Sequence, residues 1–325
     1  MFSVIYKKYF LAATVVIFAV SLGIIAVFGL QYSIDFTGGA LTEVSYDVVP
    51  TKAELESALT PLNLGGVSVR ETTLGDRGEG YFIRTRDLSE EERTTLEETI
   101  LAVGEGGNIE RFTTVGPTIG AELSSKAVWA LGFVSLIIIL YVAYAFAGIG
   151  KPVSAWIYGL ITIFVLFHDV LVPTAMMSLL GHFVGAEIDV LFVMAVLAVL
   201  GYSVNDTIVV FDRVRENLKL NRTERRTKIK EPGGIELEHV EYTLTKPFND
   251  IIGPAVTETL GRSINTSFTT LLALIALYFF GGELTKNFAL VLMAGVVAGT
   301  YSSICMAVPL LAAYAKWQAK REISK

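Results

Sequence analysis

The sequence predicts a membrane protein with six transmembrane α-helices and one extracytoplasmic α+β domain between the first two helices. Of its 325 residues 52% are hydrophobic, and the mean hydropathy is +0.55, which is too apolar for an ordinary soluble domain. The charged residues lie in a few blocks, and the apolar runs between them approach the roughly 20 residues that a membrane-crossing helix needs. The net charge of −6 therefore sums over separate compartments and says little about partners.

The first apolar run, residues 10–30, is expected to cross the membrane as a retained anchor. It follows Lys7 and Lys8, and no small-residue cleavage site comes after it. Its length of about 21 residues suits a span better than a removed signal peptide. Residues 1–30 are thus expected to hold the N-terminus and the first transmembrane helix.

Residues 31–125 have a soluble composition and predict a small domain of the ferredoxin-like type. The expected order is β-α-β-β-α-β, with strands at 41–48, 67–73, 81–86 and 109–115, helices at 51–62 and 89–103, and a turn at 75–78. Each helix is predicted to open with a capping box, Thr51 with Glu54 and Ser89 with Glu92. Acidic residues outnumber basic ones by about ten, so we expect a solvated acidic surface that binds neither nucleic acid nor anionic lipid.

Five further apolar runs complete the six spans and form one bundle over residues 127–315. The expected helices cover 127–147, 153–180, 190–211, 263–280 and 288–315. The basic residues that bear on orientation are Lys7 and Lys8, Lys151, the cluster 213–230 and the tail 316–325. Because these all fall on one side of the predicted membrane, both termini are expected to be cytoplasmic and the α+β domain extracytoplasmic.

The expected cytoplasmic loop, residues 212–258, is unusually long. It contains a basic stretch at 221–230, a Glu-Pro-Gly-Gly breaker at 231–234 and a second polar stretch. The composition fits either a disordered hairpin or a docking element. Pro247 and Pro254 argue against one continuous helix leading into the fifth span.

The fourth span carries Asn205 and Asp206 inside an otherwise apolar run. A carboxylate at the membrane centre costs about 2.5 to 3.5 kcal/mol on insertion scales, so it is a functional hypothesis that calls for a partner. At about 1.5 Å per residue Asp206 lies ~24 Å into its helix. An Asp near the membrane exit that reaches water is the simpler alternative.

Arg262 and Thr266, at the start of the fifth span, are the predicted partners of Asp206. By the same arithmetic they lie ~28 and ~22 Å from the outer boundary, which brackets the depth of the carboxylate. Pairing would hold Asp206 ionised, and protonation would release Arg262. Asn205 and Thr266 could satisfy the remaining donors and acceptors. The alternative is a purely structural ion pair between two helices.

His168 and Asp169 in the third span are candidate relay residues, because His titrates near neutral pH. They could equally form a packed pair. Gly295 and Gly299 have the small-x-x-x-small spacing of close helix contacts, without indicating which helix is the neighbour. The lone Cys305 is expected to serve packing.

The sequence holds no motif for enzymatic chemistry. It has no Walker A string, no His or Cys cluster with metal spacing, no GxSxG elbow and no dinucleotide glycine fingerprint. We therefore expect no enzyme, no cofactor and no bound metal. Any work that the protein performs must draw on an ion gradient or on a partner.

Two strings carry a family resemblance. Residues 201–217, GYSVNDTIVVFDRVREN, look like the signature of the SecF branch of the SecD/SecF protein-export family, which is itself similar to RND transporters. The Asp35-Phe36-Thr37-Gly38-Gly39 string resembles the segment that opens the first extracytoplasmic domain in that family. The resemblance covers nearly the whole chain, although about twenty residues near 221–251 look inserted.

The resemblance implies a function. Such proteins lie in the bacterial cytoplasmic membrane, pair with SecD, and assist export through the SecYEG channel after the SecA-driven stage. Their Asp of the Asn-Asp-Thr string and their Arg and Thr of the Arg-x-x-x-Thr string are the proton-conducting candidates, here Asp206, Arg262 and Thr266. The outer domains are thought to pull on the exported polypeptide. Protons are the expected coupling ion, with sodium as the alternative.

Two other functions remain alternatives. Half of an RND-like transporter for small molecules or lipids would be expected to carry larger outer insertions. A non-transporting assembly or scaffold subunit of the translocon would use Asp206 and Arg262 only structurally. The sequence makes no prediction about stoichiometry, about the role of the inserted loop or about the outer surface that contacts the exported chain.

Overall fold

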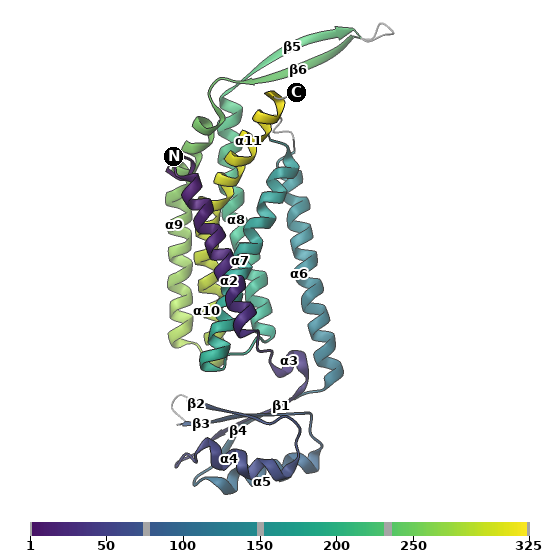
Figure 1. The fold of residues 1–325 in the computed structure, drawn as a ribbon, viewed down its shortest axis with the longest axis vertical. Helices are drawn as coiled ribbons and strands as arrows, with labels where there is room; N and C mark the ends of the chain where they lie inside the picture. Colours follow the sequence, from purple (N-terminus) through teal and green to yellow (C-terminus); the bar gives the residue numbers. More distant parts are fainter. Residues whose placement is uncertain (1, 74–78, 148–152, 231–235, 324–325) are drawn as a thin grey trace.

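The computed structural model describes residues 2–73, 79–147, 153–230 and 236–323. A helical bundle occupies the middle of the molecule, a small sheet domain lies at one end and a two-stranded hairpin at the other (Figure 1). Both chain termini lie at the hairpin end. Within the described residues six helices are long and apolar enough to cross a membrane, so the expected number of spans is confirmed.

The outer domain, as we call residues 39–115, is a four-stranded antiparallel sheet covered on one face by two helices (Figure 1). Its elements are β1 (Gly39–Ser45), α4 (Lys52–Leu59), the short η1 (Thr60–Leu62), β2 (Ser68–Thr73), β3 (Glu79–Thr85), α5 (Glu90–Val103) and β4 (Asn108–Val115). The spatial order of the strands is β2-β3-β1-β4. Alternate strand residues such as Val44 and Ile83 pack against Leu55 and Leu96 of the helices, and all four are fully buried. The predicted turn at 75–78 lies outside the described residues.

Both predicted capping boxes are confirmed. The backbone N–H of Thr51 donates to Glu54 at 2.8 Å, and that of Ser89 donates to Glu92 at 3.0 Å. Glu92 also accepts from Arg86, with Nη2 and Oε1 2.5 Å apart. The hydrogen bond from the Arg86 side chain is the largest effect, and the capping hydrogen bond from the backbone of Ser89 adds to it. Together they lower the pKa of Glu92 to about 2.

The depressed pKa of Glu92 predicts a pH dependence. The stabilisation of the folded state by ionised Glu92 is fully present at a pH above the ordinary pKa of a glutamate carboxyl group. It is lost as the pH falls through about 2. We expect amide-exchange protection of α5 to fall over that window in the wild type, and expect Glu92→Gln to show low protection already at higher pH. Arg86→Gln should reproduce most of this loss. A wild-type α5 whose protection does not change over the window would contradict the prediction.

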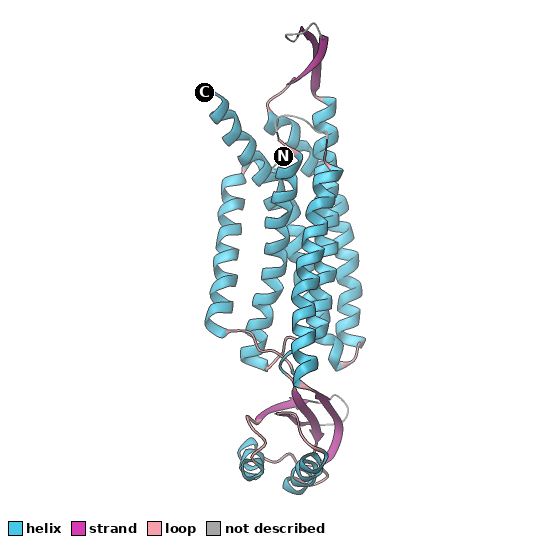
Figure 2. Cartoon of the chain, turned by 90° about the vertical axis from the view of Figure 1, so that its right-hand side faces the viewer, coloured by secondary structure: helices cyan, strands magenta, loops and turns pink. Residues whose placement is uncertain are grey.

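The membrane-spanning bundle is built around three central helices. Its members are α1 (Phe2–Ile5), α2 (Lys7–Phe28), α6 (Pro117–Ala145), α7 (Ala155–Val184), α8 (Val190–Leu220), α9 (Phe248–Phe280), α10 (Glu283–Ser302), the π-helical turn η3 (Ser303–Ala307) and α11 (Val308–Ile323). About half of the most apolar stretch is buried in α7, in α8 and in the last span, whereas α2, α6 and α9 leave most of theirs exposed. Figure 2 shows the helices from a second direction, with the sheet and the hairpin again at opposite ends.

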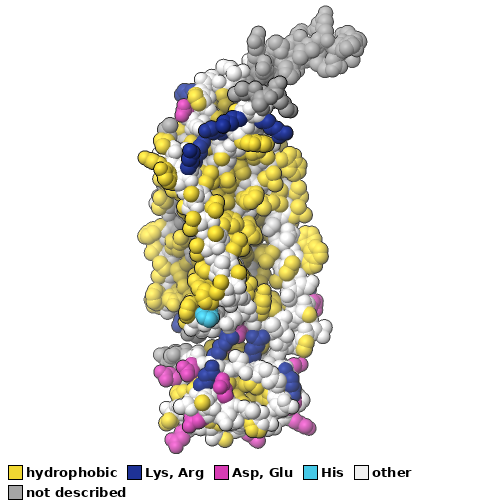
Figure 3. All heavy atoms as spheres, viewed as in Figure 1, with side chains coloured by type: hydrophobic (Ala, Val, Ile, Leu, Met, Phe, Trp, Pro, Cys, Tyr) yellow, Lys and Arg dark blue, Asp and Glu magenta, His cyan; other side chains and the backbone are white. Residues whose placement is uncertain are grey.

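The charged side chains are arranged by level on the face that Figure 3 shows. Apolar side chains form a band around the bundle, Lys and Arg side chains gather at the hairpin end of that band, and charges of both signs cover the outer domain. The basic residues of the hairpin end include Lys316, Lys320 and Arg321 of α11. Lys151, which also entered the orientation argument, lies outside the described residues.

The fifth span is longer than the sequence predicted. Its helix α9 begins at Phe248, directly after Pro247, and continues through Pro254 instead of starting at residue 263. The expectation that the two prolines prevent a continuous helix is therefore wrong for Pro254, whereas the helix does begin directly after Pro247. Pro254 stands in the second turn and forfeits one hydrogen bond, while neighbours such as Ile251 and Val256 are buried in the bundle core.

The long loop between α8 and α9 contains the β5–β6 hairpin. Strand β5 (Arg222–Lys230) pairs with β6 (Glu236–Leu244) in antiparallel register, from Arg222 opposite Leu244 to Lys230 opposite Glu236. The predicted breaker at 231–234 lies outside the described residues. The structure thus contains a hairpin in this loop, and a docking role stays a prediction.

Candidate functional site

Asp206 is buried in the interior of α8. Its side chain is 4% exposed, and Ser203 and Thr207 on the same helix face are fully buried. Within the described residues, Oδ2 of Asp206 and Oγ1 of Thr207 have no hydrogen-bond partner. A buried carboxylate oxygen without a donor is costly, which marks Asp206 as a candidate functional residue.

Arg262 and Thr266 lie on α9 beside this carboxylate, but they do not form the expected pair with it. Arg262 is exposed, and the hydroxyl of Thr266 donates back to its carbonyl oxygen at 2.9 Å. The Arg262 guanidinium is a neighbouring positive charge, and the buried Ser263 hydroxyl has no hydrogen-bond partner among the described residues. No ion pair joins Asp206 to Arg262 in the part of the chain that the structure describes. Asn205 is exposed and points away from the bundle core.

A second carboxylate, Asp169 of α7, has a complete set of donors. Its Oδ2 accepts from the hydroxyl of Ser203 on α8 and from that of Ser302 on α10, the latter at 2.7 Å. Its Oδ1 lies 2.8 Å from Nδ1 of His168. Asp169 and His168 are 0% and 1% exposed. Ser203 precedes Asp206 by one helical turn, so both lie on the same face of α8. The Asp169 carboxylate, which contacts Ser203, therefore packs against the face that carries Asp206.

Gly295 and Gly299 allow α10 to approach α8 closely at this level. A Cβ atom on Gly299 would lie 3.1 Å from Cβ of Ser203, and one on Gly295 would overlap the side chain of Val199. The predicted close contact is thus confirmed, and α8 is the neighbour. Small residues at this crossing bring Ser302 within reach of the Asp169 carboxylate.

The glycine contact predicts stability changes of opposite sign. Gly295→Ala should lower the stability of the bundle by about 1 to 3 kcal/mol, because the added methyl group overpacks against Val199. Gly201→Ala on α8 has open space around it and should be neutral or stabilising by up to about 1 kcal/mol. Thermal unfolding in detergent compares the two variants, and an equal shift in both would contradict the contact.

The Asp-Phe-Thr-Gly-Gly segment, residues 35–39, forms the junction between the outer domain and the bundle. Gly38 has φ 72° and Gly39 has φ 122°, a region that favours glycine. A Cβ atom on Gly38 would lie 2.8 Å from Cα of Pro117, and one on Gly39 would lie 2.5 Å from the carbonyl oxygen of Thr85. The two glycines are therefore required by the close approach of β3 and α6.

The same segment is attached to the beginning of α8. Oδ2 of Asp35, in the short helix α3 (Ile34–Thr37), accepts from the backbone N–H of Val190 at 3.2 Å. A parallel bridge joins Tyr32 to Ile188 immediately before α8. The N-terminus of α8 is thus held by the segment that leads directly into the sheet.

Two arginines of the sheet reach the loop between α7 and α8. Arg70 of β2 and Arg84 of β3 lie 3.2 and 3.4 Å from Oε1 of Glu187. Arg70 also donates to the carbonyl oxygen of Gly185 at 2.6 Å, and Arg84 to that of Tyr32 at 2.7 Å. Burial raises the pKa of Glu187, and the two guanidinium groups oppose that rise. We call these contacts the outer latch.

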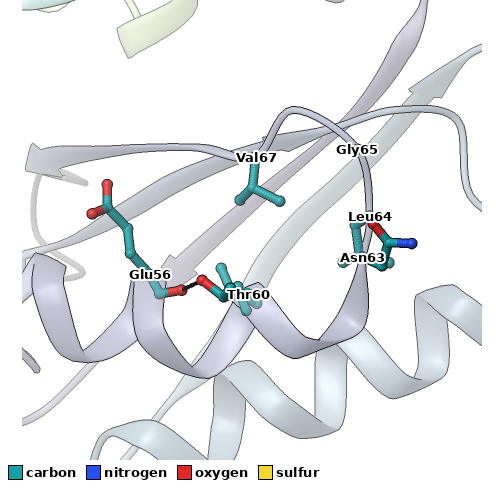
Figure 4. Close-up of a pocket in the computed structure, with 7 residues that line it drawn as sticks. Glu56, Thr60, Asn63, Leu64, Gly65 and Val67 are labelled. Atoms are coloured by element: carbon teal, nitrogen blue, oxygen red, sulfur yellow. Dashed lines mark hydrogen bonds between the residues drawn. The ribbon is translucent and has the colours of Figure 1, made fainter.

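A shallow pocket of about 340 Å³ lies on the outer domain, between the end of α4 and the loop into β2 (Figure 4). Its charged group, Glu56, is paired with Lys52 at 3.7 Å, and the Thr60 hydroxyl donates to the Glu56 carbonyl oxygen. The pocket belongs to the outer domain and takes no part in the chemistry of the buried carboxylates.

Sequence reasoning missed the hydroxyl groups and the arginines that complete these sites. They are Ser203 and Ser302 in the bundle and Arg70 and Arg84 in the outer latch. The two serines lie within largely apolar segments of the sequence. A small polar residue in such a segment is the feature that could have marked them as buried hydrogen-bond donors. Across the described ranges no three His, Cys, Asp or Glu side chains gather as metal ligands.

Two family models match most of the chain. A model described as "Protein export membrane protein SecD/SecF, C-terminal" matches residues 95–233 and 236–317. A second, described as "SecD/SecF GG Motif", matches residues 23–48 and so includes the two junction glycines.

Individual relatives agree with these matches. The chain is 36% identical over 297 residues to a protein of Thermobaculum terrenum named "Protein translocase subunit SecF", covering 88% of this chain and 85% of the relative. It is 33% identical over 314 residues to the protein of the same name from Anaerolinea thermophila, covering 96% and 93%. To the "Protein translocase subunit SecDF" of Thermus thermophilus it is 33% identical, covering 98% of this chain but 39% of that longer protein.

Two solved structures resemble the fold. The crystal structure of the Thermus SecDF, described as a translocon-associated membrane protein, aligns with a TM-score of 0.76 at 31% identity. The alignment covers 96% of this chain and 38% of that one. A SecDF structure in a "Super-membrane-facing form" aligns with a TM-score of 0.65 at 30% identity. The chain thus spans less than half the length of these SecDF proteins.

Proposed function

The chain belongs to the SecD/SecF family of protein-export membrane proteins and is a SecF-type translocase subunit, not an enzyme, and we propose that a flow of protons past Asp206 powers its work. The observation that supports this proposal is the buried Asp206 carboxylate, whose Oδ2 has no hydrogen-bond partner within the described residues. Ionisable groups inside a membrane typically mark ion pathways.

The proposed cycle alternates two states of Asp206. The ionised carboxylate attracts the nearby Arg262, whereas the protonated group no longer attracts Arg262. Asn205 and Thr266, on the same exposed side of α8 and α9, orient the groups along the path. The change of charge thus alters how α9 packs against α8.

A SecD-like subunit is the proposed partner. Arg262 and Asn205 are exposed on membrane-spanning helices, where a charged or polar group facing lipid is expensive. A second six-helix unit against this face would cover them and supply further polar groups. The SecDF relative, which is more than twice as long as the region aligned here, fits such an arrangement.

The outer domain is proposed to be extracytoplasmic and ferredoxin-like. The β-α-β-β-α-β order and the antiparallel strand order β2-β3-β1-β4 support the fold. Both termini share the hairpin end with the Lys and Arg belt, which supports placing that end in the cytoplasm of the bacterial cell (Figures 1 and 3). In this orientation the protein would assist SecYEG from within the membrane, and the outer domain would hold the polypeptide that emerges on the extracytoplasmic side.

Export into inverted vesicles tests the energy source. Vesicles carrying this chain with its SecD-like partner should complete export of a reporter faster when a pH gradient is imposed, and an uncoupler should remove the gain. A sodium gradient at fixed membrane potential should give no gain. Export that needs the chain but ignores both gradients would support the scaffold alternative and overturn the proposal.

A further inference from the structure

We propose that His168 and Asp169 form a proton-binding site separate from Asp206, in which Nε2 of His168 takes up the proton and the Asp169 carboxylate balances its charge. The two side chains are 1% and 0% exposed, with Nδ1 and Oδ1 2.8 Å apart. Among the described residues Nε2 has no hydrogen-bond partner. The site therefore contains one nitrogen that is buried and free to accept.

The hydrogen bonds fix where each proton lies. Oδ2 of Asp169 accepts two O–H groups, from Ser203 and Ser302, which is the pattern of an ionised carboxylate. An ionised Asp169 requires His168 to donate its Nδ1 proton, and this leaves the lone pair of Nε2 unused. In this state the site carries one net negative charge.

The burial of that charge favours uptake of a cation. An isolated carboxylate in a low-dielectric interior is strongly unfavourable unless a positive charge accompanies it. One proton taken from water onto Nε2 makes the pair neutral overall, whether the shared proton sits on Nδ1 or on Oδ1. The proton comes from a hydronium ion, whose O–H bond breaks and leaves a water molecule, and the N–H bond at Nε2 is the bond that forms.

The geometry favours a proton over a metal cation. Both serine hydroxyl groups lie within hydrogen-bond distance of Oδ2, and that of Ser302 also contacts the carbonyl oxygen of Gly299 at 3.1 Å, so both are engaged in hydrogen bonds. The His168 ring lies against the rings of Phe18 on α2 and Tyr301 on α10, with centroids 5.7 and 5.8 Å away. Hard cations need several oxygen ligands, and these aromatic rings supply none toward Nε2.

Few titratable groups on the neighbouring helices face the His168–Asp169 pair. Facing groups that can titrate are Tyr301, whose hydroxyl contacts Thr14 at 3.2 Å, Cys305 of η3 and, one turn along α8, Asp206. The lysines of α2 lie at its other end, at positions 7 and 8. Asp206 lies one helical turn beyond Ser203 on α8, and an ionised Asp206 would strengthen proton uptake.

The site joins three helices, so its charge affects their packing. Ser203 and Ser302 tie α8 and α10 to α7 through one oxygen of Asp169, next to the π-helical turn that follows Ser302. Such turns occur frequently at functional sites. The inference goes beyond the proposed relay and does not depend on it.

Histidine NMR tests the site directly. The chain has three histidines, so His182→Gln with His239→Gln leaves His168 as the sole reporter. In the full chain, labelled with ¹⁵N-histidine in lipid nanodiscs, we expect a protonated Nδ1 and a bare Nε2 in alkaline buffer. Both nitrogens should be protonated in mildly acid buffer.

Two variants separate the explanations. Asp169→Asn should abolish the second protonation over the same pH range, whereas Asp206→Asn should leave both protonation steps in place. Ser302→Ala gives a milder second variant. It removes one donor that stabilises the ionised carboxylate, so the second protonation should persist and move to higher pH. The proposal is overturned if Nε2 of the parent protein does not change its protonation, or if Asp169→Asn changes nothing. Failure of the Asp206 relay would leave these spectra unaffected.

Discussion

Asp206→Asn is expected to remove all of the gradient-dependent part of export while leaving the gradient-independent part intact. Asparagine is nearly isosteric with aspartate but cannot bind and release a proton, so the proposed pathway loses its titrating group. The measurement is export of a secreted reporter into inverted vesicles with and without an uncoupler, at matched protein level. With the variant, the two conditions should give the same yield.

Asp212→Asn is the matched control for this experiment. Asp212 lies on the same helix, but its side chain is 63% exposed and pairs with Arg215 at 3.6 Å. This exposed pair contributes little, so export should stay close to wild type. If Asp206→Asn keeps the full response to the gradient, the carboxylate is architectural and the relay is wrong.

Gly38→Ala is expected to detach the outer domain from the bundle. The left-handed conformation alone costs a non-glycine residue about 1 to 3 kcal/mol. The new Cβ would also lie 2.8 Å from the backbone of Pro117, which has little freedom to move. We expect faster protease cleavage near the junction in the membrane-embedded full chain, together with reduced export.

Gly116→Ala controls for the loss of a glycine at the same junction. Gly116 precedes α6 with φ −61°, and no atom lies within 4 Å of an added Cβ. This variant should cleave at the wild-type rate. If the two variants behave alike, the tight approach at Gly38 does not hold the domain in place.

The bundle was predictable to the extent that its helices are apolar along their whole length. The N-terminal half of α9 is not, because it mixes Pro254 with polar residues, and its start was placed too late. A signal was nevertheless present, since Ile251, Ile252, Ala255 and Val256 recur at helical spacing and are buried. Tertiary burial of this face compensates for the proline.

The buried carboxylate could be found from sequence, but its partners could not. Helical rise gives the depth of a residue and not the direction in which it points, so Arg262 was placed at the right level yet lies exposed. Hydroxyl residues were harder still. Many of them bond their own helix, as Thr266 does to the carbonyl oxygen of Arg262, and packing alone selects Ser203 and Ser302 as donors to Asp169.

The attachment of α8 to the outer domain has a mechanical consequence. Asp35 holds the N-terminus of the helix that carries Asp206 further along, and the arginines of the sheet grip the loop just before it. An α-helix is stiff along its axis, so α8 behaves as a strut. Any sliding of α8 that accompanies a change of charge at Asp206 would push or pull the sheet by the same displacement, without a separate transmission element.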